Sequence, residues 1–333
     1  MHTPAPTLRF ADLLGQPKAK ELLRRAVLGG RPAHALLFRG PRGVGKRSMA
    51  LVFAAFLNCP RQEEGEPCGR CPSCLRFRSG NHPDLLRLAA DGGAIKIEQV
   101  RELKKALTFP PLEARFRVAI LPDIHAMRRE AANSLLKTLE EPPSHTILVL
   151  TGDQSGEILP TILSRCQVIP FFSLPREELT SLLASQTGLA PETAATLAAA
   201  AEGSLGRALV LHQQGLLDLR RRMVEALLRS RPDSGEAVQA ILPLAEEAAE
   251  LKEELPELLD LLSTWLRDLL LQRQGSAVSL ANPDLRPLLA AGAARWSPEE
   301  MDARLSRIDR AKRQLARNCN AVAVSEVLLL SLL

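Results

Sequence analysis

The sequence predicts two structural classes in succession, a parallel α/β domain and then a series of helices. From residue 35 to about 172, short apolar runs alternate with segments of helical spacing, which is typical of a parallel sheet covered by helices. After Leu174-Pro175 the apolar residues follow helical spacing alone. The 333 residues fit two or three domains, because a single core seldom grows beyond about 250–300 residues.

Five strands are expected in the α/β domain. Each candidate is a short, largely apolar run bounded by helix or turn signals. The candidates are Ala35–Phe38, Asp84–Leu88, Val118–Leu121, Thr146–Leu150 and Gln167–Phe172. Helices are expected to begin near Lys46, near Ile97 and near Arg128. The last of them is expected to stop at Glu141, because the two prolines that follow cannot continue a helix.

The region after the sheet is expected to form a small helical domain and a larger one. The small domain contains a turn at Gly203-Ser204. In the larger domain, Leu255–Leu271 and Met301–Leu315 are amphipathic and should bury one face each. The arginine run 220–222 begins one face of a helix and is expected to face solvent or another subunit rather than to read DNA. The predicted domain boundaries are 1–173, 174–211 and 212–333.

The composition limits the location and the partners. With 46% apolar and 24% charged residues it is typical of a soluble globular protein. The first 20 residues lack a long apolar core, and no uninterrupted apolar run of 18 residues occurs. We therefore expect no signal peptide, no membrane contact and a cytoplasmic location. The net charge of +5 fits a nucleic-acid neighbour or an ordinary solvated surface, and the 3% of aromatic residues argue against base stacking.

A glycine-rich segment directly after the first expected strand matches most of a phosphate-binding loop. Gly40–Lys46 fit the first seven positions of G-x-x-x-x-G-K-[ST]. The eighth is Arg47, which cannot ligate Mg²⁺, and Ser48 is turned by about 100° around the helix. Two interpretations stay open: weak ATP or ADP binding without Mg²⁺, or a loop kept for its turn geometry and packing. The candidate residues are Gly40, Gly43, Gly45, Lys46, Arg47 and Ser48.

Four of the six cysteines fall within one short segment, 59–74, rich in Pro, Gly and Arg. Four thiolates on a tight loop satisfy tetrahedral zinc and leave no position for a catalytic water, so a structural Zn²⁺ is expected. A redox switch or four unrelated thiols are the alternatives. The remaining two, Cys166 and Cys319, are expected to be small buried apolar residues. The expected metal ligands are Cys59, Cys68, Cys71 and Cys74.

Together these motifs resemble bacterial clamp-loader subunits of the AAA+ class, which belong to DNA polymerase III. Residues 10–172 carry the resemblance closely, and its most specific parts are Asn133–Pro143 and Ser164-Arg165-Cys166. The resemblance implies a RecA-like AAA+ domain with a five-stranded parallel sheet, a small helical lid and a C-terminal helical collar. It further implies a hetero-pentamer with gamma or tau and delta subunits, which works on a sliding clamp and primer-template DNA.

Subunits of this family are of two kinds, ATP-hydrolysing gamma or tau subunits and a non-hydrolysing delta-prime subunit. Beside Arg47, two further positions lack the residues of the ATPases. Pro122-Asp123 stands where an ATPase carries Asp-Glu, and Gly206 stands where it carries a phosphate-sensing arginine. Thr151, expected just after the fourth strand, could still touch a terminal phosphate. We therefore expect a delta-prime type subunit without ATPase activity, with a gamma/tau-type ATPase as the alternative.

The resemblance also gives Arg165 a role. In the family, the arginine of the Ser-Arg-Cys motif reaches into the ATP site of the neighbouring subunit and stabilises charge on the γ-phosphate, as an arginine finger does. The alternative is an arginine that pairs with a local carboxylate at the end of a strand. A zinc-bearing DNA-binding module unrelated to clamp loading remains a further alternative for the whole chain.

Overall fold

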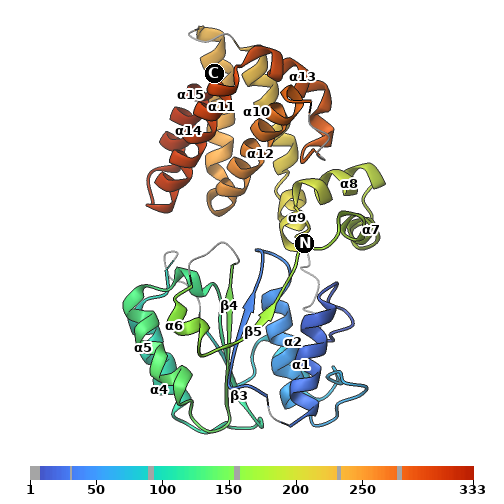
Figure 1. Cartoon of the computed structure of the whole chain (residues 1–333), viewed down its shortest axis with the longest axis vertical. Helices are drawn as coiled ribbons and strands as arrows, with labels where there is room; N and C mark the ends of the chain where they lie inside the picture. Colours follow the sequence, from blue (N-terminus) through green and yellow to red (C-terminus); the bar gives the residue numbers. More distant parts are fainter. Residues whose placement is uncertain (1–7, 31, 89–93, 154–157, 231–233, 276–279) are drawn as a thin grey trace. The chain divides into compact units, whose positions relative to one another are not determined.

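The computed structural model describes residues 8–30, 32–88, 94–153, 158–230, 234–275 and 280–333. The chain divides into two compact units, Met1–Ser173 and Leu174–Leu333 (Figure 1). The first unit contains the sheet and the second is built of helices, so the predicted succession of fold classes is confirmed. The further boundary at residue 211 stays a prediction.

The sheet of the first unit has five parallel strands in the order β2-β3-β4-β1-β5. The strands are β1 Ala35–Arg39, β2 Leu85–Arg87, β3 Arg117–Leu121, β4 Thr146–Gly152 and β5 Gln167–Pro170. All five expected strands are present. The fourth is longer than expected, because Thr151 and Gly152 continue the parallel pairing with Phe38 and Arg39 of β1. The expectation that Thr151 follows the strand is therefore wrong.

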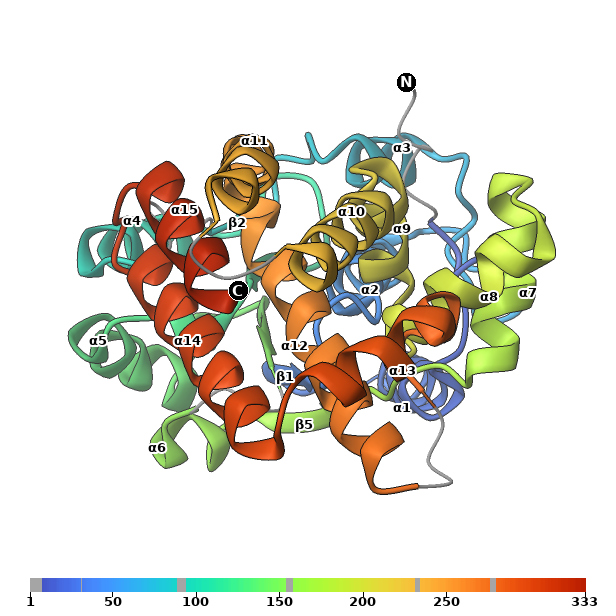
Figure 2. The same cartoon turned by 90° about the horizontal axis from the view of Figure 1, so that it is seen from above.

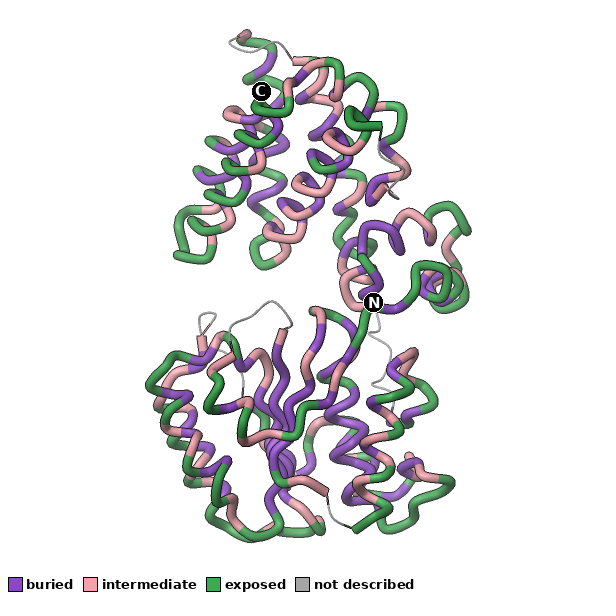
Figure 3. Tube along the Cα trace, viewed as in Figure 1, coloured by how far each residue is buried: buried purple, intermediate pink, exposed green. Residues whose placement is uncertain are grey.

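Helices cover both faces of this sheet (Figure 1). They are α1 Pro17–Leu28, α2 Lys46–Asn58, α3 Pro72–Ser79, α4 Ile97–Leu107, α5 Arg129–Glu140 and the short α6 Pro160–Leu163. Successive side chains of a strand point to opposite faces. Leu36 and Phe38 of β1 therefore join the core under α1 and α2, and Ala35 and Leu37 join the core under α4 and α5. Figure 3 shows the strands as the most buried part of this unit.

The second unit contains nine α-helices within its described residues, and no strand occurs in that part of the chain. They are α7 Arg176–Thr187, α8 Pro191–Ala200, α9 Leu205–Gln213, α10 Leu216–Arg229, α11 Gly235–Glu250, α12 Leu255–Arg273, α13 Arg286–Arg295, α14 Pro298–Ala316 and α15 Ala321–Leu332. α15 packs against both α11 and α14 (Figures 1 and 2). Near the centre, Trp265 and Trp296 meet edge to face, with ring centroids 5.7 Å apart.

None of the described helices is by itself long and apolar enough to cross a membrane. The pair α8 and α9, bent by 116°, passes that test together by length and composition only.

Two expectations for single residues are wrong. Arg220 is fully buried, because the helical period places it on the face of α10 that also carries Leu216 and Met223. Its guanidinium pairs with Asp284 there. Cys319 is exposed, because it lies in the turn between α14 and α15. Cys166 is partly buried, and burial raises the pKa of its thiol to about 11.

Candidate functional site

The four clustered cysteines lie between the end of α2 and the first turn of α3. Cys59 directly follows α2, and Cys71 is the N-cap of α3, so two helix ends set the spacing of the cluster. All four Sγ atoms lie within 4.8 Å of one another, and Cys68 is the only one that is partly exposed. This separation fits four thiolates around one tetrahedral ion. The cluster predicted from the spacing is present and could hold a metal ion such as zinc.

Backbone amides point at the sulfur atoms of this cluster. The N–H of Cys68 donates to Sγ of Cys59 at 3.3 Å, and the N–H groups of Cys71 and Cys74 donate to the preceding cysteine sulfurs at 3.4 Å each. Burial raises the pKa of the Cys59 and Cys74 thiols. At Cys68 burial also opposes ionisation, but the amides of Arg70 and Cys71 outweigh it and lower the pKa to about 7. A bound cation would deprotonate all four, because a coordinating thiol ionises outright.

The cysteine segment is fastened to the start of the chain by Glu66. Its buried carboxylate accepts the backbone N–H of Phe10 at 2.6 Å and pairs with Arg24 of α1. Arg24 also donates to the carbonyl of Gly65 at 3.2 Å. The segment that carries the cysteines and α1 are thus joined by one polar network.

The glycine loop joins β1 to α2 at the carboxyl edge of the sheet. Gly43 and Gly45 have φ angles of 73° and 93°, a region that residues with a Cβ rarely adopt. At Gly40 a Cβ would lie 2.3 Å from the carbonyl oxygen of Phe171, so that glycine is required by packing. Both physical requirements hold without a ligand. The loop geometry therefore leaves the two interpretations of its glycines open.

The two cations that begin α2 already have partners within the chain. Lys46 is buried, and its Nζ donates to the carbonyls of Gly40 at 2.5 Å and Pro41 at 2.6 Å. Burial lowers the pKa of Lys46, against the influence of two nearby carboxylates, of which Asp123 is one. Arg47 pairs with Asp123, whose backbone N–H donates to Oγ1 of Thr151 at 3.1 Å.

The contacts of Arg47 and Thr151 bear on whether the loop can bind Mg²⁺. Arg47 stands where a metal-binding hydroxyl is required, and its guanidinium neutralises the one carboxylate that follows β3. Thr151 is buried and uses its hydroxyl to hold that same segment. Ser48 is exposed on the next position of α2. The residues present do not fit Mg²⁺, since position 47 offers no hydroxyl and Arg47 pairs with the nearby carboxylate.

Arg165 lies between α6 and β5, away from the glycine loop in sequence. Its Nε donates to Oε1 of Glu140 at 2.6 Å, and Nη2 also pairs with that oxygen. Nη1 donates to the carbonyl of Thr161 at 3.0 Å and to Oγ of Ser164 at 3.1 Å. The side chain remains 32% exposed. In the isolated chain, Arg165 therefore makes the local carboxylate pair that was the alternative to an arginine finger, while part of it stays accessible.

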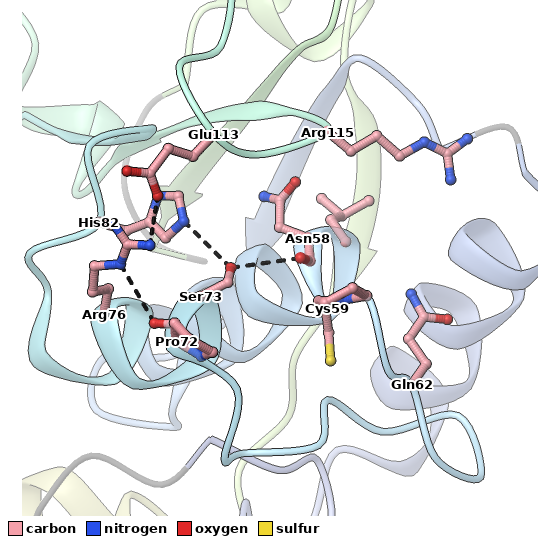
Figure 4. Close-up of a pocket in the computed structure, with 11 residues that line it drawn as sticks. Asn58, Cys59, Gln62, Pro72, Ser73, Arg76, His82, Glu113 and Arg115 are labelled. Atoms are coloured by element: carbon pink, nitrogen blue, oxygen red, sulfur yellow. Dashed lines mark hydrogen bonds and ion pairs between the residues drawn. The ribbon is translucent and has the colours of Figure 1, made fainter.

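A cavity of about 480 Å³ lies beside the cysteine segment (Figure 4). Ser73 and His82 meet in it with Oγ and Nε2 3.3 Å apart. Nδ1 of His82 accepts the backbone N–H of Asp84 at 3.1 Å, so the neutral ring carries its proton on Nε2. The ring thus donates to Ser73 and cannot act as its base. The pair holds the loop together and does not form a nucleophile.

The sequence alone assigns no role to three residues of these networks. Glu140 belongs to the Asn133–Pro143 motif, but only the structure brings it to Arg165, 25 positions further on. Glu66 lies between the cysteines and carries no motif. Asp84 is buried and accepts three backbone amides besides Arg117. No local sequence pattern predicts such pairs, because each depends on two segments that are distant in sequence.

The strand order, the loop after β1 and the helical second unit are those expected of an AAA+ protein. Comparison with known proteins gives the family. Residues 15–175 match the family described as "DNA polymerase III, delta subunit", and residues 214–333 match its C-terminal family. The chain belongs to the family of DNA polymerase III clamp-loader subunits.

Curated relatives include both kinds of subunit. The chain is 33% identical over 215 residues to DNA polymerase III subunit tau of Bacillus subtilis, a match that covers 62% of this chain and 38% of tau. It is 39% identical over 183 residues to subunit delta' of the same organism, which covers 55% of each chain. The matches thus span about a third to a half of the length of these relatives. Their identities are too similar to choose between the two kinds.

A solved structure supports the fold. A DNA polymerase III gamma subunit-related protein from Thermotoga maritima aligns with a TM-score of 0.50 and 20% sequence identity, covering 93% of this chain and 97% of that one. At this identity the likeness concerns the fold alone.

Proposed function

We propose that this chain is the delta-prime type subunit of a bacterial clamp loader, which completes the ATP site of a neighbouring subunit and hydrolyses no ATP itself. The observation that carries the proposal is the ion pair between Arg47 and Asp123. The exposed guanidinium of Arg47 pairs with the carboxylate that follows the strand where an ATPase holds Mg²⁺, and Mg²⁺ is needed to neutralise charge on the transferring phosphoryl group. Pro122 adds no carboxylate to replace the lost one.

The helical unit supports the same proposal. Gly206, at the position of the phosphate-sensing arginine of the ATPases, has no side chain to offer. The adjacent Arg207 donates from Nε to Glu257 at 2.9 Å and from Nη1 to Glu202 at 3.5 Å. Both partners belong to the helical unit, so Arg207 is engaged there and does not substitute for the missing arginine.

Arg165 is the residue proposed to act on the neighbour. Its planar guanidinium suits phosphate, and it is partly exposed at the end of a short helix. The partners proposed with it are gamma or tau and delta subunits, a sliding clamp and primer-template DNA, in the cytoplasm. The cysteine cluster is proposed to bind one structural Zn²⁺.

The decisive experiment reconstitutes the loader with its cognate gamma-type ATPase and delta subunit. Arg165→Ala is expected to lower the hydrolysis stimulated by DNA and clamp by about tenfold or more, because arginine fingers contribute about 10³ to 10⁵ where one site is measured alone. Arg165→Lys should restore little, since it keeps the charge and loses the bidentate geometry. Unchanged hydrolysis with Arg165→Ala would show that the finger assignment is wrong.

The ATPase alternative is tested on the chain alone. The purified protein is expected to show no ATP turnover with Mg²⁺, with or without DNA. Turnover that disappears in Lys46→Ala would instead identify an ATPase subunit of the gamma or tau kind.

A further inference from the structure

The guanidinium of Arg165 is almost completely engaged within the chain. Of its five N–H donors, Nε and one donor of Nη2 point to Glu140, and two donors of Nη1 point to Thr161 and Ser164. One donor is left. An arginine that binds a phosphate with two parallel hydrogen bonds needs a complete edge of the guanidinium. Arg165 has no complete edge free in this conformation.

The edge that Glu140 occupies is the one best suited to an oxyanion. Nε and Nη2 of an arginine form the fork that carboxylates and phosphates bind in the same way. Both nitrogens lie on Oε1 of Glu140. A phosphate oxygen from outside the chain would have to replace this carboxylate oxygen, so the two anions compete for one edge.

We propose that Glu140 is a positioning residue that holds Arg165 in a parked state and releases it when a neighbouring subunit presents the phosphates of its nucleotide. The inference rests on the proposed finger function of Arg165. It adds that the isolated chain is not preorganised for catalysis. When the chain assembles with a nucleotide-loaded neighbour, a phosphate replaces the carboxylate of Glu140 as the anion bound to Arg165.

The ends of two helices bring the pair together. Glu140 is the last residue of α5, and Pro142 and Pro143 prevent the helix from continuing. The carboxyl end of a helix carries partial negative charge, which favours a cation nearby. Arg165 lies in the turn after α6, and α6 packs against α5, so this turn places Arg165 near the end of α5. The helix end and the carboxylate therefore attract the same guanidinium.

The pair is weak enough to open. The side chain of Arg165 is 32% exposed and that of Glu140 is 47% exposed. Ion pairs exposed to this degree contribute little, since water screens them and two long side chains lose freedom. A phosphate carries more charge than one carboxylate and can displace it. The ion pair therefore favours the parked position of Arg165 without preventing its release. Removing the pair should change the rate of ATP hydrolysis by about two- to fivefold.

The parked state can be measured on the full chain alone, without any loader activity. The Nε–H signal of Arg165 is followed by ¹⁵N NMR and assigned by its loss in Arg165→Lys. In Glu140→Gln we expect this proton to exchange with water at least about twofold faster, because the amide oxygen binds the guanidinium less strongly than a carboxylate. Glu141→Gln is the matched control. Glu141 is the glutamate next to Glu140 and is exposed, so this substitution should leave the exchange rate unchanged. Equal rates in wild type and Glu140→Gln would overturn the proposal.

The functional test uses the reconstituted loader with ATP and without DNA or clamp. Glu140→Gln is expected to raise kcat about two- to fivefold with little change in KM, because the finger no longer has to leave a carboxylate. In the Arg165→Ala background the same substitution should have no effect. A fall in kcat, or an equal change in both backgrounds, would contradict the proposal.

The two measurements separate this inference from the proposed function. If Arg165→Ala leaves loader hydrolysis unchanged while Glu140→Gln still speeds the Nε–H exchange, the finger function fails and the ion pair stands as a structural contact only. If Arg165→Ala lowers hydrolysis but Glu140→Gln changes neither readout, the finger stands and the parked state is wrong. Circular dichroism of each variant verifies that the fold is kept.

Discussion

Single buried charges connect segments of the first unit that are far apart in sequence. The carboxylate of Asp84 accepts the amides of Leu112, Glu113 and Ala114 at 2.7–2.9 Å, and Arg117 donates to it from Nη2 at 3.1 Å. Burial raises the pKa of Asp84, but these hydrogen bonds outweigh it and hold the pKa below its usual 3.8. The charged form is therefore the one that the fold stabilises.

The pH dependence of stability follows from the sign of this shift. A carboxylate whose pKa is lowered by folding contributes stability above its unfolded pKa, and the contribution is lost as the pH falls through the folded value. Asp84→Asn is expected to destabilise the first unit by about 3 kcal/mol at pH 7, because it leaves Arg117 without its charge partner. The difference from wild type should shrink below about pH 4.

Urea unfolding followed by far-ultraviolet circular dichroism at pH 7 and at pH 3.5 checks this prediction. Asp12→Asn is a suitable control, since Asp12 is an exposed carboxylate of the same unit. A destabilisation by Asp84→Asn that stays constant across this range would mean that the charge of Asp84 is not the stabilising property.

Residue positions also show where local patterns mislead. The run 220–222 has the composition of a solvated surface, yet Arg220 is fully buried and the pKa of its guanidinium is lowered by burial. Its acceptors are the side chains of Asn282 and Asp284, more than 60 positions away. A sequence pattern can assign a face of a helix, but it cannot name the partner that makes a buried charge tolerable.

At the scale of elements, the ends of two helices explain the residues of the turn between them. Asn318-Cys319-Asn320 is the turn between α14 and α15. Asn318 has a φ angle of 58°, a conformation that asparagine tolerates better than most residues. The side chain of Asn320 caps α15 by accepting the N–H of Ala323 at 3.0 Å. The motif is thus required by backbone geometry and capping.

Loss of the cap should be measurable. Asn320→Ala is expected to destabilise the helical unit by about 1 kcal/mol, because an orphan N–H of the first turn loses its acceptor. Asn320→Asp, which can still cap, should cost much less. Both tryptophans, Trp265 and Trp296, lie in this unit, so their fluorescence reports its unfolding. A negligible effect of the alanine variant would show that α15 depends on packing alone.

Elements were the best-predicted level of this protein. Each expected strand and each of the helices at Lys46, Ile97 and Arg128 begins within one residue of its expected start. Their periodicity is local and each run is strongly apolar. The C-terminal ends of the strands are predicted less accurately, as the extension of β4 to Gly152 shows, because a strand ends where its neighbour stops pairing. That neighbour is set by the fold.

At the scale of the whole molecule, the cysteine cluster is expected to affect the stability of the first unit alone. The contacts of Glu66 link the cysteine segment to Phe10 and Arg24, so a metal bound by the cysteines would stabilise the start of the chain as well as its own loop. All residues of this network lie in the first unit. The second unit should therefore unfold independently of the metal.

Removal of the metal tests this division. A strong zinc chelator, or Cys68→Ser, is expected to release one Zn²⁺ per chain and to lower the free energy of unfolding of the first unit by about 4 kcal/mol, the linkage expected when free zinc exceeds its Kd a thousandfold. The tryptophan transition of the helical unit should not move. Cys319→Ser, which changes an exposed cysteine outside the cluster, serves as the control. Absence of bound zinc in the purified protein would show that the cluster is not a zinc site.

The sequence by itself determined the fold classes, the cysteine spacing and the missing hydroxyl at Arg47, because all three depend on neighbours within a few residues along the chain. Only the tertiary structure decided what Arg47 and Arg165 do in the isolated chain. Arg47 pairs with Asp123 and Arg165 with Glu140, across separations of 76 and 25 residues. A charge is neutralised by whichever group the folded chain brings within hydrogen-bond distance, and that choice is made by the packing of whole elements.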